Sequence, residues 1–160
     1  MKLRQLFAAF LALVFTVPLC GQVQQSEVKS LLKAASSALD HYQQIASGIH
    51  CDEATTAESR GDCENTLGTL ADRVAEAKEK IARCRESSTP QIVNLFDAYE
   101  SFRRVVAVVE DVNYTPAPYG EHNKVLFAES YNTLIKVNGW FGGAVRQSIQ
   151  AAEGCSKPRS

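Results

Sequence analysis

The sequence lacks the motifs on which several classes of helical protein depend. It contains no C-x-x-C-H, and its single methionine is Met1, so neither covalent haem nor an axial methionine in the mature chain is expected. No E-x-x-H pair exists, which removes the di-iron pattern of carboxylate bundles. H-E-x-x-H, G-x-S-x-G and a phosphate-binding loop are also missing. The residues therefore favour a non-enzymatic protein without a cofactor.

The chain also lacks an excess of positive charge. It has 17 Lys and Arg against 18 Asp and Glu, a formal net charge of −1. Without residues 1–21, 15 basic and 18 acidic residues remain, a net charge of −3. Nucleic acids and anionic lipid surfaces attract basic proteins, so no nucleic-acid partner is expected.

The first 21 residues are typical of a secretory signal peptide. Lys2 and Arg4 precede an apolar run from Leu6 to Leu19, which is shorter than the roughly 20 apolar residues of a membrane span. No later run approaches a transmembrane segment. We expect cleavage after Gly21, and export to the periplasm or the extracellular space. A lipid anchor at Cys20 is not expected, because Leu19 stands where a lipidated cysteine follows a small residue.

Residues 22–160 suit a single domain with one core. Apolar residues recur at alternating steps of three and four in four runs, which predicts helices over residues 26–47, 63–86, 90–112 and 121–153. Gly48 is a candidate C-cap of the first helix and Asp62 a candidate N-cap of the second. Pro90 suits the first position of the third helix. The prolines and glycine of residues 115–120 end that helix.

The fourth predicted helix is about ten residues longer than the others, roughly 15 Å at 1.5 Å per residue. Its stretch NGWFGG, residues 138–143, holds three glycines, and each costs about 1 kcal/mol relative to Ala in a helix. We expect this helix to bend or break near Gly139–Gly143. Alternatively, Gly139 and Gly143 form a close-packing site for the second helix, which offers Ala71, Ala75 and Ala77.

Short connections between four helices favour a disulfide-stabilised, up-down-up-down four-helix bundle. Four cysteines remain after residue 21, an even number that indicates two disulfides in an exported protein. In this topology Cys51 lies beside Cys63, and Cys84 near Cys155. Pairing Cys63 with Cys84 is excluded, because 21 helical residues separate them by about 31 Å. We predict Cys51–Cys63 and Cys84–Cys155.

Two groups of aromatic residues are candidate binding sites. Trp140 and Phe141 flank the glycines of the fourth helix, and aromatic side chains dominate protein recognition. Tyr114 and Tyr119 bracket a proline-containing loop that can serve recognition. This loop begins with Asn113-Tyr114-Thr115, a glycosylation acceptor pattern. The structural alternatives are a kink or close-packing site in the fourth helix for the first group and an ordinary connection for the second.

His41, His50 and His122 fall at one end of the predicted bundle, where acidic residues also lie. A metal site there is conceivable, although no two of these histidines are three or four residues apart. The sequence thus indicates an exported, non-enzymatic interaction or structural protein of unidentified partner. The alternative is a periplasmic or secreted carrier of a small ligand or a metal.

Overall fold

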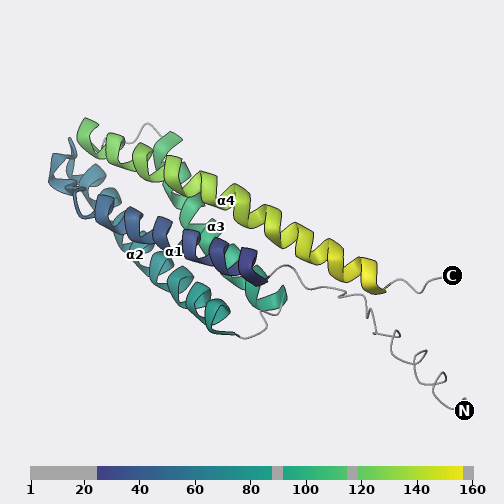
Figure 1. Ribbon diagram of the computed structural model, residues 1–160. Coiled ribbons are helices and arrows are strands. Elements are labelled where there is room, and N and C mark those ends of the chain that lie inside the picture. The colour runs from purple at the N-terminus through teal and green to yellow at the C-terminus, as the bar shows by residue number, and fades with distance from the viewer. Residues whose placement is uncertain (1–24, 88–91, 115–118, 157–160) are drawn as a thin grey trace, which may run out of the picture.

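A computed structural model describes residues 25–87, 92–114 and 119–156, with Gln25 and residues 153–156 described by backbone alone. Within these ranges all regular elements are helical: α1 (Gln25–Ala46), the short 3-10 helix η1 (Cys51–Glu53), α2 (Ala57–Glu86), α3 (Ile92–Tyr114) and α4 (Glu121–Ser156) (Figure 1). The predicted all-α class with four packed helices is confirmed. The predicted signal peptide, residues 1–21, lies outside the described residues.

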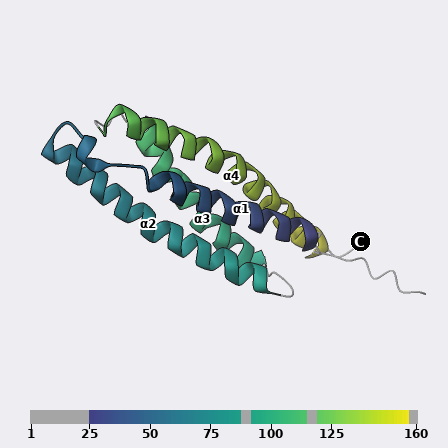
Figure 2. The same ribbon diagram turned by 60° about the vertical axis from the view of Figure 1, so that its left-hand side comes forward.

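The helices pack side by side along their lengths (Figures 1 and 2). Contacts are most extensive between α2 and α3, α3 and α4, and α1 and α4, and sparser between α1 and α2. The end of α1, the start of α2, the end of α3 and the start of α4 lie together at one end of the molecule. At the other end the last turns of α4 project beyond the remaining helices. The first helix is therefore held chiefly by the last.

The core consists of the apolar seams that the sequence pattern predicts. Among its largest fully buried side chains are Phe102, Phe127, Phe141, Leu32, Leu39, Leu70, Ile81 and Leu134. The ring of Phe141 lies 5.4 Å from that of Tyr99 and 6.0 Å from that of Phe102, centroid to centroid. Each buried Phe or Leu contributes about 1.5–3 kcal/mol by removal from water. Aromatic packing between α3 and α4 thus forms the centre of the core.

The second helix begins at Ala57, earlier than the predicted residue 63. Thr56 is its N-cap and accepts a hydrogen bond from the Ser59 backbone N–H at 3.1 Å. Asp62 is therefore an interior residue and not the cap. The apolar pattern missed this first part because it is polar, and its register is fixed by a cap hydrogen bond rather than by hydrophobic contacts.

A charged cluster on the surface links α2 to α3. The Glu76 carboxylate accepts a hydrogen bond from Lys80 at 2.7 Å and one from Ser101 at 3.5 Å, and lies 3.8 Å from the Arg104 guanidinium. The hydrogen bond from Lys80 is the main cause that lowers the pKa of Glu76. Because these groups are partly exposed, solvent screens them and they add little to the free energy of unfolding. The apolar seams carry that stability.

The fourth helix is continuous through its glycines, so the predicted break near Gly139–Gly143 is wrong. The cost of three glycines, about 1 kcal/mol each, is smaller than the gain from burying Phe141 and Val145 on the same turns. A methyl group added at Gly142 would lie 2.8 Å from the Tyr99 hydroxyl oxygen. Added at Gly139 or Gly143, it would meet nothing within 4 Å.

The glycines consequently do not have the role expected for a G-x-x-x-G pair. Gly139 and Gly143 face open space, so the predicted close approach of Ala71, Ala75 and Ala77 there is wrong. Gly142 has the packing role, since its missing side chain accommodates Tyr99 of α3. Because Phe141 points into the core, Gly142 faces Tyr99 of α3, whereas Gly139 and Gly143 face away from the neighbouring helices.

Alanine substitutions distinguish the three glycines. We expect Gly139→Ala and Gly143→Ala to stabilise the protein by up to about 1 kcal/mol each, because Ala is the better helix former. Gly142→Ala should instead destabilise it by about 1–3 kcal/mol through overpacking. In a Tyr99→Phe background, which removes the clashing oxygen, Gly142→Ala should cost less. Urea unfolding measures all three, and equal effects at the three positions would contradict this packing.

Candidate functional site

The loop end of the bundle is covalently closed by the predicted Cys51–Cys63 disulfide, which the structure contains. Its two Cα atoms are 5.6 Å apart, and it joins η1 to α2. Cys63 is fully buried. The bridge holds the connection between α1 and α2 against the start of α2, so the side chains around it have fixed positions.

Asn123 holds the start of α4 against this connection. Its side chain is fully buried; its amide nitrogen donates to the backbone oxygens of His50 at 2.9 Å and Tyr119 at 2.6 Å. Its side-chain oxygen accepts from the His50 backbone N–H at 3.0 Å. Gly120, with φ of 97°, places its Cα against Glu53, where an added methyl group would lie 3.1 Å from the Glu53 Cβ. Both features were missed from the sequence, in which Asn123 shows only as a polar residue on the apolar face.

Removal of the Asn123 amide leaves buried backbone groups without partners. We expect Asn123→Ala to lower the free energy of unfolding by at least about 2 kcal/mol, since each unsatisfied buried group costs about 1–3 kcal/mol. Asn132→Ala, at an exposed position of the same helix, should change it by less than about 0.5 kcal/mol. Denaturant titration compares the two, and similar losses would refute the proposed role of Asn123.

The predicted aromatic pair on α4 is divided between surface and core. The Trp140 side chain is 65% exposed, whereas Phe141 is fully buried. Phe141 therefore packs in the core and is not available to a partner, because the seam of α4 turns it inward. Only Trp140 of this pair lies where another molecule can contact it.

The two loop tyrosines are divided in the same way. Tyr114 ends α3, is 70% exposed and packs edge-on against Tyr131 at 5.9 Å. A hydrogen bond with Tyr114 is the main cause that raises the pKa of Tyr131 to about 12. Tyr119 is buried, with its ring 6.2 Å from Phe127. The acceptor Asn113 lies in α3 rather than in a loop, and Thr115 lies outside the described residues.

The three histidines do not converge on a common point. His41 lies 4.0 Å from the Glu129 carboxylate, and His50 is engaged through its backbone by Asn123. His122 is exposed at the start of α4. Among the residues that the structure describes, no three His, Cys, Asp or Glu side chains are grouped to hold a metal ion. The histidine end of the bundle offers no observation in favour of the metal alternative.

Cys84 is a buried free thiol, so the predicted Cys84–Cys155 bridge is not formed in the structure. The side chain of Cys155 lies outside the described residues. Tyr119 and Thr66 are level with each other, their hydroxyl oxygens 3.4 Å apart. Cys84 follows Thr66 by 18 residues, about 27 Å, whereas Cys155 follows Tyr119 by 36 residues, about 54 Å. Because α4 is longer than α2, its end lies well beyond the end of α2, and the two cysteines are not at the same level.

Cys84 should be protected from alkylation in the folded protein. Burial raises the pKa of its thiol above the ordinary value of 9.0, and only the thiolate reacts. We expect iodoacetamide at pH 8 to label Cys84 after denaturation but not before, as read by peptide mass spectrometry. Since the unfolded chain loses this proton first, the contribution of Cys84 to stability is present below pH 9 and declines above it. Labelling of the folded protein at the rate of a free thiol would contradict the burial.

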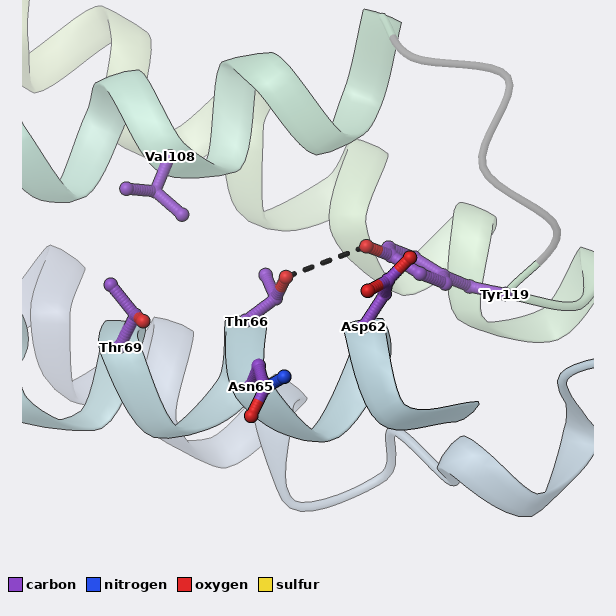
Figure 3. A pocket seen from close by; sticks show the side chains of 6 residues that line it. All are labelled: Asp62, Asn65, Thr66, Thr69, Val108 and Tyr119. Carbon is purple, nitrogen blue, oxygen red and sulfur yellow. Dashed lines mark hydrogen bonds between the residues drawn. The ribbon is translucent and has the colours of Figure 1, made fainter. Parts of the chain in front are cut away.

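A pocket lies between α2, α3 and the segment leading into α4 (Figure 3). Its volume is about 290 Å³, and it is lined by Asp62, Asn65, Thr66, Thr69, Val108 and Tyr119. Thr66 and Tyr119 place their hydroxyl oxygens 3.4 Å apart across it. Of these residues only Tyr119 was a predicted site residue. The others form no recognisable sequence motif, since four lie on successive turns of α2 and Val108 lies on α3.

Comparisons with protein-family models, with curated proteins and with solved structures found no match. The functional proposal therefore rests on the positions and chemistry of the described side chains.

Proposed function

We propose that this chain is an exported, non-enzymatic interaction protein that contacts a partner through the surface around Trp140. The observation that carries the proposal is the 65% exposure of the only Trp in the sequence. Trp is among the residues that contribute most to binding when a partner covers them. An exposed indole does not gain the free energy of burial that a core position would provide, and a partner that covers it can supply this gain.

The surroundings of Trp140 suit close contact with another chain. Gly139 and Gly143 are open on the same helix, so a partner can approach the α4 backbone beside the indole. Tyr114 is a second exposed aromatic residue, at the end of α3. Its ring packs on Tyr131 of α4, nine residues before Trp140 and roughly 14 Å along the helix axis, so Tyr114 is a separate contact.

Export is supported by the N-terminal pattern and by the Cys51–Cys63 bridge, because disulfides persist in oxidising compartments. None of the described helices has the length and apolarity needed to cross a membrane. The proposal includes the up-down-up-down order of the helices and a bend of α4 at its glycines. A metal-carrier function through the histidines has no observation in its favour among the described residues.

Replacement of Trp140 tests the proposal directly. We expect Trp140→Ala to leave the free energy of unfolding within about 0.5 kcal/mol, while abolishing recovery of the partner by affinity capture from the fluid into which the protein is exported. Val125→Ala, an equally exposed apolar position on α4 (64%), should retain the partner.

Intrinsic fluorescence gives an independent measurement, since Trp140 is the sole indole. Acrylamide should quench it freely in the isolated protein and much less in the complex. Unchanged quenching on complex formation, or full partner recovery by Trp140→Ala, would overturn the proposed role.

A further inference from the structure

The pocket between α2 and α3 combines one unpaired negative charge with neutral polar groups. The exposed side chain of Asp62 has no ion pair or hydrogen bond with the described residues, and neither do the side chains of Asn65 and Thr69, which are exposed as well. Thr66 and Tyr119 each keep hydrogen-bonding capacity beyond their mutual contact, because a hydroxyl has one donor and two acceptor positions. No Lys, Arg or His side chain lines the pocket. A cationic ligand is therefore favoured and an anionic one opposed.

The remaining wall of the pocket is apolar. Val108 of α3 faces Thr66 and Thr69 of α2 across the space, and the ring of Tyr119 closes one end (Figure 3). Tyr119 is held in place by its packing on Phe127 and by the hydrogen bond from Asn123 to its backbone oxygen. A ligand with an apolar portion thus meets a preformed surface, and its polar ends meet Asp62 and the hydroxyls.

The volume of about 290 Å³ is at the lower limit of ordinary small-molecule sites, which span about 300–1,000 Å³. The pocket is open to solvent, so this volume limits only the part of a ligand that lies within it. One carboxylate with hydroxyls and an amide is also a poor donor set for a bare metal ion, which prefers several carboxylates. A compact organic ammonium group, in contrast, needs a single counter-charge and a few hydrogen-bond acceptors.

We propose that this pocket binds a small protonated organic amine that also carries a hydroxyl group. The ammonium group pairs with the Asp62 carboxylate, the apolar portion lies against Val108 and the Tyr119 ring, and the hydroxyl bonds to the Thr66–Thr69 side. This site is distinct from the proposed partner surface, because its lining residues belong to α2, α3 and the segment before α4, whereas Trp140 lies within α4.

The test uses three probes of one shape and different charge: tyramine, its neutral alcohol analogue tyrosol, and the anion 4-hydroxyphenylacetate. Binding to the full exported chain is followed by calorimetry and by NMR shifts of the α2 amides at pH 7. We expect saturable binding of tyramine, severalfold weaker binding of tyrosol, and no binding of the anion. Added salt should weaken tyramine binding by screening the charge.

Matched variants identify the site. Asp62→Asn should weaken tyramine binding severalfold, because a charge pair at an exposed carboxylate is partly screened by solvent, whereas Asp72→Asn, at another exposed position of α2 outside the pocket, should leave it unchanged. Trp140→Ala should also leave it unchanged, which separates this proposal from the partner surface. Absence of saturable tyramine binding, equal affinity for tyrosol, or unaltered binding by a folded Asp62→Asn protein would each overturn the proposal.

Discussion

The register of α4 against the rest of the molecule depends on the buried amide of Asn123. This single side chain bonds to the backbone of His50 on both its donor and acceptor groups, and to Tyr119 on its own chain segment. A shift of α4 along its axis would leave these buried groups unpaired, at about 1–3 kcal/mol each. Hydrophobic contacts tolerate small displacements better than such directional bonds do. Asn123 therefore fixes the position of α4 along its axis, which the apolar seam alone would leave less well defined.

Once α4 is fixed in this register, the positions of its other residues follow. Phe127, Leu134 and Phe141 fall on the buried seam, and Gly142 meets Tyr99. Trp140, one residue before Phe141, is then directed to the surface. The exposed indole is thus a consequence of core packing on its neighbour. It is also the feature that gives the surface a candidate anchor for another molecule.

The sequence pattern predicted the apolar seams well, because a period of 3.6 identifies a buried helical face without knowledge of the partner helix. Cys51–Cys63 followed from the same order of elements. The start of α2 was missed because Thr56 acts through a cap hydrogen bond, which leaves no periodic signal. The pairing of Cys84 with Cys155 and the close packing of Gly139 and Gly143 depended on helix offset and rotation. Composition and spacing do not determine either quantity.

The pocket could not be predicted for a related reason. Asp62, Thr66 and Thr69 are ordinary polar residues of one helix, and their combination with Val108 and Tyr119 exists only after three segments pack. The role of Asn123 required the same knowledge, since a polar residue on an apolar face can be buried with partners or turned to water. Sequence reasoning found the elements, and the site depends on their mutual placement.

In this structure α4 holds α1 in place, and the seam from Phe127 to Val145 is part of the global core. Native-state hydrogen exchange tests it most directly. We expect the amides of this seam and those of the middle of α1 to exchange only by global unfolding, with one common free energy. Exchange of α4 through a separate, lower-energy opening, while α1 stays protected together with α2 and α3, would contradict it.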